Sequence, residues 1–292
     1  MSSQRSFVTN LELRESNPDG TEGAGLSHTA EGLFLLHVLE LAADGDPRGA
    51  VTIVHDAGEH GARYEPLANR FAEAGWAVAL PDLRGHGNSE GERGHCWGLP
   101  EPVRDIDSIQ DHLAYQMPDA PKALVGVGLG ALYSLAFALK HPGRISALVL
   151  ISPILKPSFQ PVPKQGGLKG LFNKPKPTDP GVLGFAPEQL FNDAGAQSAY
   201  RGDALVHDVV TRHTADNLPG EAAAMLGQVG SLATPTLILH GADDPLSGPS
   251  DSSVIASAET RVIDGARHGL LHEASGDQTA ADIVAWVDGQ AS

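Results

Sequence analysis

The segment at residues 122–140 constrains the fold more than any other part of the chain. A short apolar run leads into three alternating glycines, Gly126, Gly128 and Gly130, and a helical pattern follows at residues 129–140. Glycine tolerates the positive φ and the close backbone approach that a sharp turn between a strand and a helix requires. The segment therefore predicts a buried strand that turns directly into a helix.

The same alternation recurs along most of the chain. Short apolar runs predict strands and are separated by amphipathic patterns that predict helices. Short buried strands that alternate with helices are typical of a mostly parallel sheet covered on both faces, so we expect an α/β fold. The strands are expected at residues 32–41, 50–55, 76–80, 122–126, 147–151, 236–240 and 260–263, and the helices at 64–74, 103–113, 129–140 and 280–287.

Two segments depart from this alternation. Residues 1–30 are polar and rich in Gly, Ser and Thr, which predicts a flexible N-terminal segment. Residues 154–230 begin rich in Pro and Gly and end with helix-like segments, and an insertion of this size is usually a functional cap. The predicted α/β core therefore comprises residues 31–153 and 231–290.

The composition excludes several classes of function. A net charge of −16 argues against nucleic acid as a partner, because binding phosphates requires clustered Lys and Arg. The single cysteine, Cys96, excludes an internal disulfide. No apolar run approaches the roughly 18 residues of a transmembrane segment, and the first residues lack the pattern of a signal peptide. We expect a cytoplasmic protein.

Three ordered motifs carry a family resemblance. They are His55-Asp56-Ala57-Gly58-Glu59-His60 with Arg63-Tyr64, Asp82-Leu83-Arg84-Gly85-His86-Gly87-Asn88-Ser89-Glu90-Gly91, and the segment from Tyr200 to His207. Together they resemble the monoacylglycerol lipase and lysophospholipase (serine aminopeptidase-like) branch of the α/β-hydrolases, over roughly residues 30–288. The resemblance implies an α/β-hydrolase fold with an inserted cap and a serine ester hydrolase as ancestor.

The resemblance also implies positions for a catalytic triad, which follows the chain order Ser, Asp, His. The acid corresponds to Asp244, with Asp243 as its competitor, and the base corresponds to His268, with His272 as a weaker candidate. The nucleophile position is Gly128, which has no side chain. A covalent acyl-enzyme through residue 128 is therefore excluded.

Other positions near this turn also differ from the family pattern. The backbone N–H groups of Ala57 and Leu129 are the expected oxyanion-hole donors. Asp56 stands where the family has glycine, and Val127 stands where it has histidine. An inward, ionised Asp56 would repel a tetrahedral intermediate, whereas an outward Asp56 would face solvent or pair with Arg84. Both orientations are consistent with the sequence.

The expected cap carries a local cluster of positive charge. Five of the seven lysines lie between residues 156 and 176, interleaved with apolar side chains: Lys156, Lys164, Lys169, Lys174 and Lys176. Such a patch is typical either of peripheral contact with anionic lipid or an acidic partner, or of a solvated flap. No metal-binding spacing of His or Cys is present, so we expect neither a metal nor another cofactor.

Three hypotheses of function are consistent with these residues. The first is a pseudoenzyme that keeps a pocket the size of a lipid or an acyl ester. The second is a serine-independent hydrolase or lyase in which the His268–Asp244 dyad acts as general base. The third is an interaction module that uses the basic cap. Whether the chain is an enzyme stays open at this point.

Overall fold

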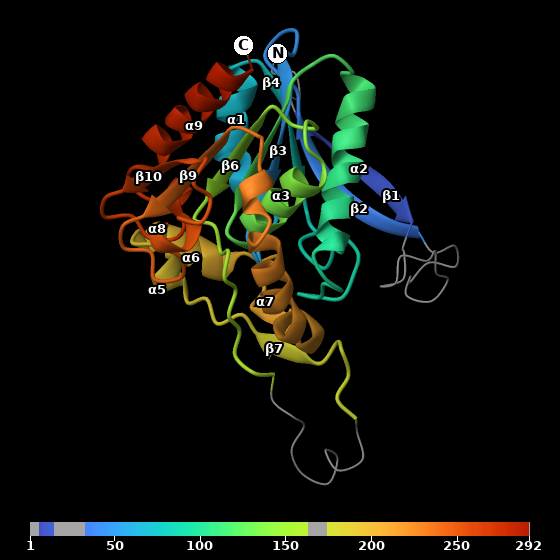
Figure 1. Ribbon diagram of the computed structural model, residues 1–292, viewed down its shortest axis with the longest axis vertical. Helices are drawn as coiled ribbons and strands as arrows, with labels where there is room; N and C mark the ends of the chain where they lie inside the picture. Colours follow the sequence, from blue (N-terminus) through green and yellow to red (C-terminus); the bar gives the residue numbers. More distant parts are fainter. Residues whose placement is uncertain (1–5, 15–32, 163–173, 292) are drawn as a thin grey trace.

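A computed structural model of the protein describes residues 6–14, 33–162 and 174–291. Its central sheet has eight strands in the order β1-β2-β4-β3-β5-β6-β9-β10 (Figure 1). The strands from β4 to β10 are paired in parallel, and β2 joins β1 and β4 antiparallel. Their bounds are β1 Ser6–Arg14, β2 Leu33–Leu41, β3 Gly49–Val54, β4 Trp76–Pro81, β5 Lys122–Val127, β6 Ala147–Ile151, β9 Thr236–Gly241 and β10 Glu259–Ile263.

Helices cover both faces of the sheet, so the predicted α/β architecture is confirmed. Helices α1 (Glu65–Glu73) and α9 (Gly276–Gln290) pack on one face, and α2 (Pro100–Gln116) and α3 (Leu129–Lys140) pack on the other. Strands β3, β6 and β9 are buried along their whole length, which explains their continuous apolar sequences. Short elements follow the core strands: η1 Gly61–Tyr64, α8 Pro249–Ser252 and η3 Leu270–His272.

The N-terminal segment differs in part from the expectation. Residues 6–14, predicted to belong to a flexible segment, form the edge strand β1, which pairs antiparallel with β2. Leu11 and Leu13 pack against the small core cluster that contains Phe34, Leu36 and Val38. Alternating side chains of this kind bind a strand to a sheet even where its other face is polar.

The segment between β6 and β9 breaks the alternation, as predicted, and lies beyond one end of the sheet (Figure 1). The boundaries drawn for it, residues 154–230, stay a prediction. Lys164 and Lys169 lie outside the described residues, while Lys156 forms an ion pair with Asp251 (Nζ–Oδ1 3.0 Å). Among the helices of the described ranges, none is long and apolar enough to cross a membrane. The described elements of the segment are β7 Pro180–Val182, α5 Pro187–Leu190, α6 Ala194–Gly202, β8 Val209–Thr211, α7 Arg212–Leu226 and η2 Val229–Ser231.

Candidate active site

The site begins at the turn between β5 and α3. Gly128 has φ 55° and ψ −116° and immediately precedes the first residue of α3. Its N–H donates to the carbonyl of Ile151 (3.0 Å), and its own carbonyl accepts from the N–H of Ile154 (3.0 Å). A residue with a Cβ would be strained at this positive φ, whereas glycine adopts it freely. The backbone of the turn is therefore fully formed without a side chain at position 128.

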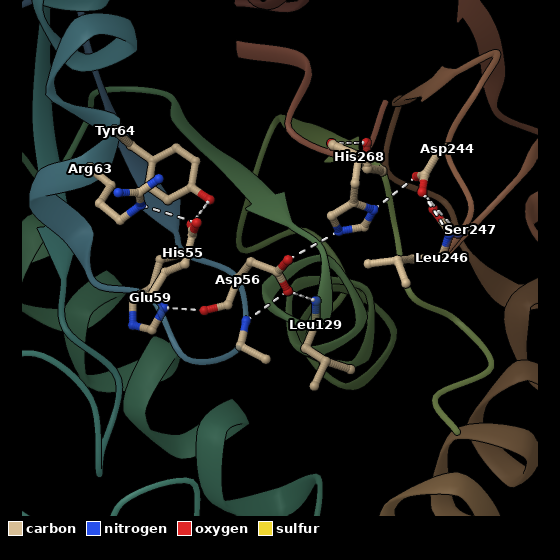
Figure 2. Close-up of polar contacts among 12 residues, drawn as sticks. His55, Asp56, Glu59, Arg63, Tyr64, Leu129, Asp244, Leu246, Ser247 and His268 are labelled. Atoms are coloured by element: carbon tan, nitrogen blue, oxygen red, sulfur yellow. Dashed lines mark hydrogen bonds and ion pairs between the residues drawn. The ribbon is translucent and has the colours of Figure 1, made fainter. Parts of the chain in front are cut away.

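Asp56 follows the neighbouring strand β3 and points inward. Its Oδ1 accepts hydrogen bonds from the N–H groups of Ala57 (2.7 Å) and Leu129 (2.8 Å). Figure 2 shows the contact between Asp56 and Leu129. These are the two backbone donors that the sequence assigned to an oxyanion hole. The outward orientation is therefore wrong, and Arg84 pairs instead with Asp105 and Glu101. A carboxylate oxygen lies where the family resemblance places the oxyanion of a substrate.

The positions expected for the base and the acid meet at the same point. His268 Nδ1 lies 2.8 Å from Asp244 Oδ2, and His268 Nε2 lies 3.0 Å from Asp56 Oδ2 (Figure 2). Asp244 also accepts from the N–H of Leu246 and from the hydroxyl of Ser247, each at 2.8 Å. The imidazole of His268 is thus held between two carboxylates from opposite sides of the site.

The two competing candidates lie elsewhere. Asp243 is exposed, and it is Asp244, not Asp243, whose carboxylate meets His268. His272 packs edge-on against Phe191, with ring centroids 5.4 Å apart. The sequence missed Ser247, whose hydroxyl orients the carboxylate of Asp244. In the sequence it was marked only by its place three residues after Asp244, in the loop that follows β9.

Asp56 and Gly128 depend on each other. A Cβ added at residue 128 would lie 1.9 Å from Asp56 Oδ1 and 2.0 Å from its Cγ. Real Cβ atoms do not approach other atoms so closely, so Asp56 could not keep this position beside a serine. The carboxylate of Asp56 therefore fills the space that a side chain at residue 128 would need.

Comparisons with known proteins agree with the α/β-hydrolase fold. The family model described as "Hydrolase_4: Serine aminopeptidase, S33" matches residues 45–275. This chain belongs to the Hydrolase_4 family. It is a monoacylglycerol lipase-like α/β-hydrolase by similarity along most of its length.

Relatives of this Hydrolase_4 chain include lipases from distant organisms. A monoacylglycerol lipase of Mycolicibacterium smegmatis is 30% identical over 251 residues, which cover 84% of this chain and 89% of that protein. A solved monoacylglycerol lipase of Paleococcus ferrophilus is 26% identical, with a TM-score of 0.75 over 87% of this chain and 99% of that one. The monoglyceride lipase of Saccharomyces cerevisiae, solved with a substrate analogue, shows the shared fold at 16% identity, with a TM-score of 0.76 over 92% of this chain and 96% of that one.

The electrostatics of the Hydrolase_4 site fix the protonation of His268. Burial disfavours the charged imidazolium, but hydrogen bonds and charge interactions with Asp244 and Asp56 outweigh burial and raise the pKa of His268 to about 10. Burial also opposes ionisation of Asp244, yet its hydrogen bond with His268 leaves the pKa of this carboxyl below its usual value. At neutral pH His268 is therefore an imidazolium that donates both N–H groups, and it has no free lone pair to act as a base.

The cavities beside the site are small. One, of about 10 Å³, is bordered by Asp56, His268, Tyr64, Val127 and other residues. A second, of about 30 Å³, is lined by residues that include Ala57, Leu129 and Tyr133. A cavity needs roughly 10–15 Å³ to hold one water. Neither of these two cavities has the size of a lipid or an acyl ester.

The remaining family motif residues hold the loops around the site. Glu59 accepts from Arg63 Nε (3.0 Å) and from the Tyr64 hydroxyl (2.5 Å). His60 Nε2 lies 2.9 Å from Asp203 Oδ2, which joins the core to the inserted segment. These contacts explain the His and Glu residues without a metal. No group of three or more His, Cys, Asp or Glu in the described part of the chain is arranged to hold one.

Proposed function

We propose that this monoacylglycerol lipase-like protein is a pseudoenzyme with respect to acyl esters, so that it does not hydrolyse acylglycerols. The observation that carries the proposal is the Asp56 carboxylate on the N–H groups of Ala57 and Leu129. In serine hydrolases such donors stabilise the negative oxygen of the tetrahedral intermediate, and each is worth roughly 10²–10³ in rate. Because both N–H groups already donate to Asp56, neither is free to stabilise the oxyanion of a substrate.

Two further requirements of acyl transfer are also missing. Residue 128 offers no nucleophile, and His268 carries its proton at neutral pH. The negative charge of Asp56 would moreover repel a second oxyanion in the same place. Nucleophile, general base and oxyanion hole are thus lost together, which supports loss of acyl-ester hydrolysis more strongly than the glycine alone.

The alternative in which the His268–Asp244 dyad acts as general base has weaker support. A general base must be largely deprotonated at the working pH, whereas the pKa of His268 is raised to about 10. The alternative of an interaction module rests on the basic cap, where Lys156 is already paired with Asp251. Binding of an acylglycerol-like ligand at this site would require the small cavities to open first.

The first experiment measures hydrolysis of a short-chain aryl ester and of a monoacylglycerol by the purified protein, beside His268→Ala. The expected result is no turnover above that of the variant. Turnover by the parent protein that disappears in His268→Ala would overturn the proposal and establish catalysis by the dyad without serine.

A matched gain-of-function variant makes a negative result informative. Gly128→Ser with Asp56→Gly returns the nucleophile and empties the oxyanion hole, so esterase activity should rise by about 10² or more over the parent. Gly128→Ser alone should gain little, because Asp56 occupies the space of the new side chain. An equal gain from the single and the double variant would show that Asp56 does not block the site.

A further inference from the structure

Three imidazole rings stack where the inserted segment meets the core. His55 directly follows β3, His86 lies in the loop after β4, and His207 lies just before β8 in the inserted segment. The ring centroids of His55 and His86 are 5.1 Å apart, and those of His86 and His207 are 4.7 Å apart. The stack therefore links three parts of the chain that are distant in sequence.

Backbone hydrogen bonds fix the two outer rings in the neutral form. Nε2 of His55 accepts from the N–H of Leu83 (2.9 Å), while its Nδ1 donates to the carbonyl of the next residue (2.6 Å). Nδ1 of His207 accepts from the N–H of Val209 (3.2 Å), and its Nε2 donates to the carbonyl of Gly85 (3.2 Å). A protonated imidazole has two donors and no acceptor. Protonation of either ring would therefore set two N–H donors against each other.

The segment that carries His207 rests directly on the loop that carries Asp56. The N–H of His207 donates to the carbonyl of Gly58 (2.8 Å), and a Cβ added at Gly58 would lie only 2.2 Å from the carbonyl oxygen of His207. The N–H of Thr211 donates to the carbonyl of Gly94 (3.1 Å), in the loop after β4. The segment can leave these two loops only if both backbone hydrogen bonds break.

His207 is the ring through which acid can act, because it is half-buried whereas His55 is buried. We propose that the three stacked histidines form an acid-sensitive latch: protonation of His207 releases residues 205–211 from the core and opens the cavity beside the oxyanion-hole donors. The inference goes beyond the proposed function, since it concerns access to the site and not its chemistry.

The latch closes a cavity that has walls on both sides of this contact. The cavity of about 30 Å³ is bordered by Ala57 and Leu129 on the core and by Val209 on the inserted segment. At that volume the closed form has room for about two waters. Cys96 borders the same cavity and is buried. Release of the segment removes one wall, so it exposes the cavity and this thiol together.

The surroundings of His207 set the pH at which the latch opens. Burial of the ring lowers the pKa of His207 and the charge of Arg93 adds to this, while the Gly85 carbonyl and Asp208 oppose the shift. In the open form the ring regains the ordinary imidazole pKa of 6.5, so opening is favoured as pH falls below 6.5. The charged and titratable groups around the ring are His86 and Arg93 after β4, His55 and His60 after β3, and Arg201, Asp203 and Asp208 of the inserted segment.

The experiment uses Cys96, the single cysteine of the full chain, as the reporter of opening. It is labelled with 4,4′-dithiodipyridine, and the rate is divided by that of glutathione at the same pH, which corrects for the weaker reactivity of thiols in acid. Because one proton is taken up on opening, the corrected rate should rise by up to about tenfold between pH 7.5 and 5.5. A corrected rate that stays level or falls would overturn the proposal.

A matched pair of variants assigns the effect to one ring. His207→Gln cannot take up a proton in this range and keeps an amide that can donate to Gly85, so its corrected rate should not depend on pH. His141→Gln makes the same change at the far end of α3 and should behave as the wild type. A rate that still rises in acid in His207→Gln would assign the opening to another group and overturn the latch.

Hydrogen exchange of the wild type locates the opening and does not depend on the folding of any variant. The amides of His207, Val209 and Thr211 hold the segment in place, so after correction for intrinsic exchange they should exchange faster at pH 5.5 than at pH 7.5. The amides of β5, residues 122–127, should stay protected. An equal loss of protection in β5 would indicate global unfolding and contradict the latch. Neither readout involves an acyl ester, so failure of the latch is distinguishable from failure of the proposed function.

Discussion

Two buried clusters in this protein place one cation between two carboxylates. Arg84 binds Asp105 through Nε and Nη2 (2.7 and 2.6 Å) and Glu101 through Nη1 (2.6 Å). Burial opposes its charge, but the two carboxylates raise its pKa further above an already high value. Because both partners lie on α2, this cluster fastens the loop after β4 to that helix. Its charge cannot change in the physiological pH range.

The cluster around His268 also has one cation between two carboxylates, but its carboxylates come from different parts of the fold and its cation is an imidazolium. Asp56 and Asp244 follow two different strands of the sheet, and Asp56 also binds two backbone N–H groups at the turn before α3. The central cation is an imidazolium, which can lose its proton. The comparison shows that the same arrangement of charges can fix a loop permanently or make a site depend on pH, according to which cation stands in the middle.

The largest expected effect is a loss of stability with rising pH, which should come from His268 and not from Arg84. The folded protein raises the pKa of His268 from 6.5 to about 10. Its contribution to the free energy of unfolding is therefore complete below pH 6.5 and is lost as pH rises from 6.5 through about 10. At about 1.4 kcal/mol per pKa unit, the upper limit of this loss is about 5 kcal/mol.

This loss is measured by urea unfolding across the pH range, as the difference between the wild type and His268→Gln. Taking this difference removes the contributions of other buried groups with raised pKa values, such as Tyr64 and Cys96. Those groups also make the free energy of unfolding depend on pH in alkali. A difference that does not change between pH 6.5 and 10 would contradict the imidazolium assignment.

The next effect concerns the permanent cluster. Arg84→Met should lower the free energy of unfolding by about 3–5 kcal/mol, because it leaves the carboxylates of Asp105 and Glu101 buried without their cation. Urea unfolding at neutral pH gives the magnitude. In contrast to His268, the parent's Arg84 contribution should not fall between pH 6.5 and 10. A loss below about 1 kcal/mol, as for an exposed ion pair, would remove the parallel between the two clusters.

The smallest effect tests the dependence of Asp56 on Gly128. Gly128→Ala places a Cβ at a positive φ and against the carboxylate, so it should cost about 2–3 kcal/mol in unfolding free energy. In an Asp56→Gly background the steric part disappears and only the backbone strain remains. A double-mutant cycle measures the difference as a coupling energy, expected near 1–2 kcal/mol. Strictly additive effects would show that the two residues do not compete for space.

The sequence predicted the α/β-hydrolase fold, which the structure confirms, and it predicted candidate residues for the site. The helices predicted at residues 64–74, 103–113, 129–140 and 280–287 correspond to α1, α2, α3 and α9. Their periodic apolar positions determine which face is buried, so local sequence was sufficient. The edge strand β1 was missed because it lies next to a polar, Gly-, Ser- and Thr-rich stretch and its stability comes from pairing with β2. Propensity alone does not reveal such a partner.

By itself the sequence determined that residue 128 offers no nucleophile. The family resemblance also predicted Asp244 and His268 as acid and base. Only the tertiary structure decided where Asp56 points. The space it occupies is left by the missing side chain of Gly128, at the turn after another strand, and one of its donors, Leu129, lies 73 residues away. The protonation of His268 follows from the same contacts. Side-chain orientation and pKa depend on neighbours that only folding brings together, which is why the sequence left both open.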